Sequence, residues 1–310
     1  MHTVLGLFLG NLFLAISAIY IFILVGYSAK HFFKDRIDEK SLNLLSVYFL
    51  QVFLTFWGLL KRPLDSELLL APLVYLGIIA LVLVFTFFLA RQLFTDQKER
   101  SIASIAALIG NTGNLGIPVG IAVFGEESIP FTTLINLMNV FIVYTLGVFF
   151  YSRGHFSIQE SIKNIFKLPI LWFAFVALGI NFYKVELPFE IMRVLEMGAY
   201  ASMVLQMIIL GMYLQGVRLN HLNLKLIIHV NVIKFVLLPA LTFFILQFTP
   251  FSTMVKGIIF LELFMPLAVA NVNLGSLYEC KPKDITALIF ISSLLFLGLS
   301  FFALYALERL

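Results

Sequence analysis

The chain has 310 residues, of which 61% are hydrophobic and only 12% are charged, and its mean hydropathy is +1.01. A soluble domain typically has about 45–50% apolar and about 25% charged residues. The composition therefore excludes a soluble globular enzyme, and the high hydrophobicity excludes a disordered chain. It favours an all-α polytopic membrane protein. The net charge of +4 does not require a nucleic-acid partner, because the basic residues lie in short loops.

Ten apolar stretches are long enough to cross a bilayer, for which an α-helix needs about 20 residues. We number them spans 1 to 10, and they cover residues 5–29, 41–60, 68–90, 101–124, 129–151, 168–183, 196–216, 226–248, 254–278 and 285–307. The sequence therefore predicts ten transmembrane helices joined by short loops. The single cysteine, Cys280, excludes an intramolecular disulfide and a thiolate metal site.

Lysine and arginine are distributed unevenly between the two sets of loops. Fourteen of the 21 lie in the loops that follow odd-numbered spans, six lie on the other face, and Lys234 lies inside span 8. Acidic residues divide evenly, so the bias is purely cationic, as the positive-inside rule describes. It predicts a multi-pass protein of the plasma (inner) membrane, with the odd-numbered loops in the cytoplasm and both termini on the non-cytoplasmic side.

Ten spans divide into two halves of five, residues 1–155 and residues 156–310. Because five is an odd number, the second half inserts upside down, which is the inverted-repeat plan of many secondary transporters. Short correspondences follow the same order in both halves. Gln51 in span 2 and Gln206 in span 7 are 155 residues apart, and spans 4 and 9 each contain a proline among polar residues. We therefore expect two inverted five-helix repeats.

Span 4 contains a segment that cannot continue as a regular helix. Residues 110–120 hold four glycines together with Asn111, Thr112, Asn114 and Pro118. Proline removes a backbone donor and glycine adds backbone freedom, so the helix should break here. In hydrocarbon such a break survives only where protein or water satisfies the freed backbone groups. The segment therefore predicts a break that lines a cavity.

Span 9 has the same pattern, with Pro266, Asn271 and Asn273, and Glu262 lies one turn before the proline. A broken helix exposes the amino end of its second half, which carries about half a positive charge and free N–H groups. Two such ends near the midplane would form an anion site without arginine. The alternative is that each break is only a kink used in packing. The predicted substrate-binding residues at the breaks are Asn111, Thr112, Asn114, Pro118, Pro266, Asn271 and Asn273.

Four further polar residues lie in the spans. Gln51 and Gln206 either face the cavity and bind substrate or water, or join helices as polar residues of membrane proteins often do. An ionisable residue inside the membrane is a functional candidate by default. Glu262 and Lys234 are therefore the predicted residues for coupling to an ion or a proton. Lys234 could also pair with Glu262, attract an anion, line a water-filled cavity or extend to the cytoplasmic edge.

The span 4 motif resembles the signature of the auxin efflux carrier family of membrane transporters. The residues that carry the resemblance are Gly110-Asn111-Thr112-Gly113, Leu115-Gly116-Ile117-Pro118, Leu210-Gly211, Met265-Pro266 with Ala268 and Asn271, and Leu277-Tyr278. That family includes plant auxin exporters and bacterial permeases for malate, malonate and similar carboxylates. Its members usually have a proline in spans 2 and 7, where this chain has none and where Gln51 and Gln206 lie in or beside the corresponding stretches.

The resemblance implies a fold in which spans 4 and 9 cross at their breaks. It implies a scaffold of spans 1, 2, 6 and 7, a transport domain of spans 3–5 and 8–10, and elevator-type alternating access. The implied substrate is a mono- or dicarboxylate such as malate or an auxin-like acid. The fold is similar to that of the bile acid–sodium symporters, in which an acidic residue of span 9 has a place like that of Glu262. Coupling to a proton, to sodium or to no ion therefore stays open.

The sequence favours a secondary active or facilitative transporter of a small organic anion. A sodium-coupled, bile-acid-like symporter is the alternative within the same class. A membrane-embedded enzyme is disfavoured because Glu262 and Lys234 are the only deep ionisable residues of the spans, and a sensor is disfavoured because all loops are short. We expect no catalytic residues, no metal and no cofactor. The expected partners are the organic anion and the lipid bilayer, without nucleic acid, and a homodimer stays open.

Overall fold

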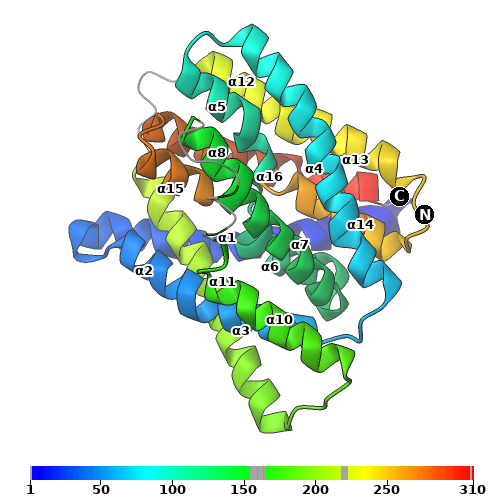
Figure 1. The fold of residues 1–310 in the computed structure, drawn as a ribbon. Coiled ribbons are helices and arrows are strands. Elements are labelled where there is room, and N and C mark those ends of the chain that lie inside the picture. Colours follow the sequence, from blue (N-terminus) through cyan, green and yellow to red (C-terminus); the bar gives the residue numbers. More distant parts are fainter. Residues whose placement is uncertain (1, 154–158, 160–162, 164, 218–222, 308) are drawn as a thin grey trace.

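The computed structural model describes the chain except for residues 1, 154–158, 160–162, 164, 218–222 and 308. The described residues form helices and loops, with one isolated β-bridge. The predicted boundary between the two halves, at residues 155 and 156, lies outside the described residues. Figure 1 shows how the helices are arranged.

The α-helices differ widely in length. They are α1 (His2–Phe33), α2 (Glu39–Leu45), α3 (Gln51–Leu60), α4 (Ser66–Leu93), α5 (Gln97–Ile105), α6 (Ile117–Phe124), α7 (Ile129–Ile142), α8 (Val148–Tyr151), α10 (Pro169–Phe182), α11 (Phe189–Gln215), α12 (Leu224–Val232), α13 (Leu238–Leu246), α14 (Thr253–Phe264), α15 (Ala270–Leu277) and α16 (Pro282–Leu307). Short 3-10 helices are η1 (Lys34–Arg36), η3 (Ala106–Leu108) and η5 (Glu126–Ser128). Single π-helical turns are η2 (Ser46–Leu50), η4 (Thr112–Gly116), η6 (Val143–Gly147) and η7 (Ile233–Leu237).

Seven helical stretches of the described chain are long and apolar enough to cross a membrane. Two shorter apolar helices, Thr112–Phe124 and Pro169–Phe182, coincide with the second half of span 4 and with span 6. A 14-residue helix such as α10 extends about 21 Å, less than the hydrocarbon core of about 30 Å. The prediction of an all-helical, multi-pass membrane protein is thus confirmed, while the ten spans and the inverted repeats stay predictions.

Charged side chains at one end of the molecule join elements from both broken helices. Lys281 Nζ, in the loop after α15, lies 2.6 Å from Glu99 Oε1 and 3.3 Å from Asp96 Oδ1, at the start of α5. Asn223 Nδ2, which precedes α12, donates to Glu99 Oε1 at 2.8 Å. The pKa of Asp96 lies below its ordinary value, chiefly because the Glu99 N–H donates to its carboxylate and also because of Lys281. These contacts fix α5, α12 and the end of α15 relative to one another.

The helices divide by their packing partners. Helix α11 packs along α1 and α3, and α3 also packs along α10. Helix α4 packs against α5, α7, α13 and α14. In Figure 1, α3, α10 and α11 lie on the opposite side of the molecule from α4, α12 and α13. Helices from spans 2, 6 and 7 are therefore neighbours, and helices from spans 3, 8 and 9 are neighbours.

The backbones of α1 and α11 approach closely at two glycines. A β-carbon on Gly211 would lie 1.9 Å from the carbonyl oxygen of Ile23, and one on Gly26 would lie 1.9 Å from the carbonyl oxygen of Ile208. Both obstructing atoms belong to backbone, so no side-chain rotation can make room. The close contact of α1 with α11 therefore requires glycine at both positions.

We expect Gly211→Leu to lower the stability of the protein by about 1–3 kcal/mol or more, because the two helices must separate. Gly179→Leu in α10 is the matched control, since a β-carbon there has open space around it. It should change stability by less than about 0.5 kcal/mol. Thermal unfolding of the purified proteins in detergent measures both, and equal stability of the two variants would contradict this account of the α1–α11 contact.

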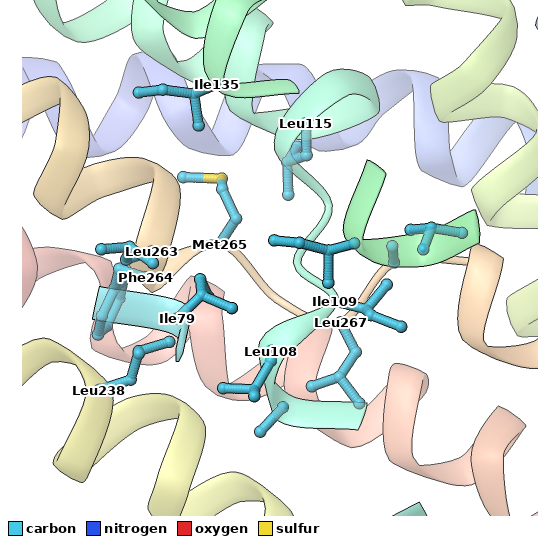
Figure 2. Packing of buried hydrophobic residues seen from close by; sticks show 14 of the residues in the cluster. Ile79, Leu108, Ile109, Leu115, Ile135, Leu238, Leu263, Phe264, Met265 and Leu267 are labelled. Carbon is cyan, nitrogen blue, oxygen red and sulfur yellow. The ribbon is translucent and has the colours of Figure 1, made fainter. Parts of the chain in front are cut away.

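The two interrupted helices meet at the centre of the fold, as predicted for spans 4 and 9. Residues 109–111 separate η3 from η4, and residues 265–269 separate α14 from α15. The two segments run antiparallel and pair at Gly110 and Leu267. We call residues 109–111 and 266–268 the crossing. Figure 2 shows that buried hydrophobic side chains, among them Ile109 and Leu267, surround it.

Candidate functional site

Backbone hydrogen bonds join the two segments of the crossing. The Asn111 N–H donates to the Pro266 carbonyl at 2.8 Å, and the Ala268 N–H donates to the Ile109 carbonyl at 3.0 Å. Each break therefore supplies partners for backbone groups that the other break frees, which is the condition for irregular backbone inside a membrane. Pro266 has no N–H, so at this position it contributes an acceptor without leaving a donor unpaired.

Side chains from neighbouring helices satisfy further backbone groups of the crossing. Asn271 Nδ2 donates to the carbonyls of Ile109 and Ala268, both at 3.1 Å, and its Oδ1 accepts from the Tyr151 hydroxyl at 2.8 Å. Asn139 Nδ2, on α7, donates to the Gly110 carbonyl at 2.7 Å. Asn271 is fully buried and both of its polar atoms are engaged, so it holds the crossing together.

Replacement of Asn271 by leucine should destabilise the protein, because the buried Tyr151 hydroxyl would lose its acceptor and the carbonyls of Ile109 and Ala268 would each lose one of their two donors. Each buried polar group left unpaired costs about 1–3 kcal/mol. Asn231→Leu is the control: this buried asparagine of α12 donates only to the Ile227 carbonyl of its own helix at 2.9 Å. Thermal unfolding in detergent compares the two variants. If Asn271→Leu loses no more stability than Asn231→Leu, Asn271 does not stabilise the crossing as we expect.

A cavity of about 100 Å³ lies against one side of the crossing. Six of the predicted site residues line it, namely Gln51, Asn111, Thr112, Asn114, Gln206 and Asn273. Pro118, Pro266 and Asn271 are not among the lining residues. Eight amide side chains contribute to the wall in total, and none of the described lining residues is charged. The cavity is therefore rich in hydrogen-bonding groups but has no fixed charge.

The amino ends of both second half-helices face this cavity. Thr112, Gly113 and Asn114 begin the η4–α6 segment, and Ala268 and Val269 lead into Ala270, the first residue of α15; all six line the cavity. The first helical bonds are donated by the N–H groups of Leu115 and Gly116 in one segment and of Asn271 in the other. The N–H groups of the residues that precede these donors have no acceptor in their own helix, as at every helix start. Two partial positive charges thus converge on one space.

Gln51 and Gln206 meet at the wall of the cavity. Gln51 Nε2 donates to Gln206 Oε1 at 3.2 Å, and Gln206 Nε2 donates to Ser202 Oγ at 2.9 Å. The two interpretations that the sequence leaves open therefore coincide in space: the pair joins α3 to α11 and also faces the cavity. Asn273 is held in a similar way, because the Tyr213 hydroxyl of α11 donates to its Oδ1 at 3.0 Å.

Glu262 and Lys234 lie elsewhere, since neither is among the residues that line this cavity. Their side chains are 0% and 1% exposed, respectively. The Lys234 ammonium lies beside Gly110, and the Glu262 carboxylate lies beside Gly116. The Lys234 ammonium is thus buried at the crossing and not at the surface of the protein. The ion pairs found within 4.0 Å among described residues do not join the two charges.

Sequence reasoning missed two asparagines of α7. Asn136 and Asn139 line the cavity, and Asn136 Oδ1 accepts from the Thr112 hydroxyl at 3.0 Å. Their signal is a pair of amides three residues apart in an otherwise apolar span, a spacing that puts both on one face of a helix. Tyr151 and Ser292 were also missed; the Ser292 hydroxyl accepts from the Leu267 N–H at 3.1 Å.

Two comparisons with known proteins bear on this site. A family model described as membrane transport protein matches residues 12–167, which include the whole first half of the crossing. The chain is also 29% identical over 285 residues to the uncharacterized transporter MJ1031 of Methanocaldococcus jannaschii, and the alignment covers 89% of this chain and 92% of that protein. The first broken helix thus lies within the region that the family model matches, and the similarity to the archaeal transporter extends over most of the chain.

Proposed function

The chain belongs to the auxin efflux carrier family of membrane transporters, and from this premise we propose that it carries a small organic anion across the membrane. The family resemblance expected from the span 4 and span 9 motifs is confirmed. A multi-pass membrane transporter is established at that coarse level, and the family is one of transporters, not of enzymes. The proposal concerns the substrate, the mechanism and the energy source.

The observation that carries the proposal is the convergence of two helix amino ends on an uncharged, amide-lined cavity. An anion there is stabilised by the partial positive charge of both ends and by amide N–H donors. A permanent cation in the wall would hold the anion more tightly and slow its release. The arrangement therefore suits a carboxylate that must bind and leave in every cycle, such as malate or an auxin-like acid.

The proposed mechanism is elevator-type alternating access. Spans 1, 2, 6 and 7 would form the scaffold, and spans 3–5 and 8–10, with the crossing, would form the moving transport domain. The packing of α11 along α1 and α3 supports a scaffold of this composition, and the contacts of α4 with α5, α7, α13 and α14 support the second group. We further propose an inner-membrane location with both termini outside the cytoplasm, which rests on the distribution of lysine and arginine.

The energy source is proposed to involve Glu262 and Lys234, the two charges buried beside the crossing. A sodium-coupled, bile-acid-like symporter is the second candidate. The decisive assay is uptake of labelled malate, and in parallel of a labelled auxin-like acid, into proteoliposomes with and without a pH gradient and with and without sodium. Uptake driven by the pH gradient supports proton coupling, uptake that requires sodium supports the second candidate, and uptake that needs neither indicates a facilitative carrier.

The first variant to test is Asn114→Leu. Asn114 lines the cavity at the start of the η4–α6 segment, so the change removes a hydrogen-bonding group from the proposed site. A hydrogen bond to a charged group contributes about 1.5–3 kcal/mol, so KM should rise about 10- to 100-fold. Asn231→Leu, which changes a buried asparagine away from the cavity, should leave KM unchanged. An unchanged KM for Asn114→Leu would remove this residue from the substrate site.

The glutamine pair gives a second test. If the pair also binds substrate, Gln51→Leu and Gln206→Leu should each raise KM by about tenfold. The free energy that corresponds to the rise in KM of the double variant should be smaller than the sum for the two single variants, because the two amides bond to each other. If the pair only joins α3 to α11, thermal stability falls and KM does not change. Uptake kinetics and thermal unfolding of the three variants separate these outcomes.

A further inference from the structure

The break in span 9 also frees carbonyl groups, at the carboxyl end of α14. Helix α14 ends at Phe264, and the next residues cannot supply its last hydrogen bonds. Pro266 has no N–H, the Leu267 N–H donates to Ser292, and the Ala268 N–H donates to Ile109. The carbonyls of residues 262–264 therefore lack the donor four residues ahead that a continuing helix would provide. Such an end carries a partial negative charge and attracts cations.

The Lys234 ammonium lies at this carbonyl end. A β-carbon on Gly110 would be 3.0 Å from Lys234 Nζ and 3.7 Å from the carbonyl oxygens of both Glu262 and Met265. The ammonium and two carbonyl oxygens of the break in span 9 thus lie around one point beside Gly110. The absence of a side chain at Gly110 is what lets Lys234, from η7 on a different span, reach this position.

The Glu262 carboxylate is the second charge in this region. Both of its oxygens are buried, and neither accepts a hydrogen bond from any described residue. A β-carbon on Gly116 would be 2.3 Å and 2.7 Å from these oxygens, so the carboxylate fills the place that a side chain at Gly116 would occupy. A buried charge is costly unless an opposite charge compensates it. Lys234 is the described residue with the opposite charge that is buried at the same crossing.

Broken-helix transporters commonly hold a coupling sodium ion with unwound backbone carbonyls and half-helix carboxyl ends. We propose that the Lys234 ammonium is a tethered cation that permanently occupies such a site here, so that the carrier neither binds nor requires an alkali cation. Glu262 is then neutralised by a charge of the chain itself. Only the consequence for coupling rests on the proposed transport function; the cation site is a property of the crossing and can be tested without substrate.

The test compares Lys234→Ala with Lys225→Ala, a change of an exposed lysine on the adjoining helix α12. Thermal unfolding of purified protein is measured in sodium, lithium and choline chloride at equal ionic strength. Wild type and Lys225→Ala should not distinguish the salts. Lys234→Ala should gain about 2–4 °C in sodium or lithium at ten times the dissociation constant, because the vacated carbonyl site and Glu262 can bind the ion. Lys234→Ala with Glu262→Gln should lose this gain.

A sodium-specific gain in wild type, or no gain in a folded Lys234→Ala protein, would overturn the proposal. If Lys234→Ala does not fold, the wild-type measurement decides, together with uptake into proteoliposomes in sodium and in choline: dependence on sodium contradicts a tethered cation and independence supports it. The proposed transport function fails by a different result, namely no uptake of any organic anion in either salt.

Discussion

The pairing of two backbone segments at residues 109–111 and 266–268 is the constraint on which the rest of the structure depends. A helix broken inside a membrane exposes polar backbone groups that hydrocarbon cannot satisfy. Here each break supplies donors and acceptors to the other, through Asn111 to Pro266 and Ala268 to Ile109. Neither break is favourable alone, so the two broken helices must form together. The amides of Asn139 and Asn271 and the hydroxyl of Ser292 complete this set of bonds.

The crossing also separates two kinds of electrostatic environment without charged side chains in the cavity wall. On one side, the starts of the η4–α6 segment and of α15 direct amide groups at the cavity. At the end of α14, freed carbonyls lie near the Lys234 ammonium. The fold thus favours an anion at one place and a cation at another through the direction of the helices. Among the described residues, the wall of the cavity that favours an anion carries no charge. At the end of α14, Lys234 supplies the positive charge.

Much of the site was accessible from the sequence because its residues break rules that apolar helices obey. The glycines around Asn111 and Thr112, and Pro266 in span 9, disrupt helical hydrogen bonding wherever they occur, so the breaks could be placed without a structure. Asn136 and Asn139 break no such rule, because an asparagine can lie on a helix face at little backbone cost, and they were missed. Asn271 was recognised as a candidate, and the tertiary structure adds that its amide bonds within the crossing and that it is not among the residues lining the cavity.

The sequence by itself determined that the chain is a multi-pass helical membrane protein with two interrupted spans, since composition, apolar length and proline are local properties. Only the tertiary structure decided which residues meet. Gln51 bonds Gln206, Lys234 reaches Gly110, and Glu262 lies against Gly116, although each pair comes from different spans. Such contacts depend on the angle and depth at which helices pack, and a run of apolar residues carries no record of which of its faces meets a neighbour. Likewise, the partial charges of two helix ends act together only where the tertiary structure brings both ends to the same space.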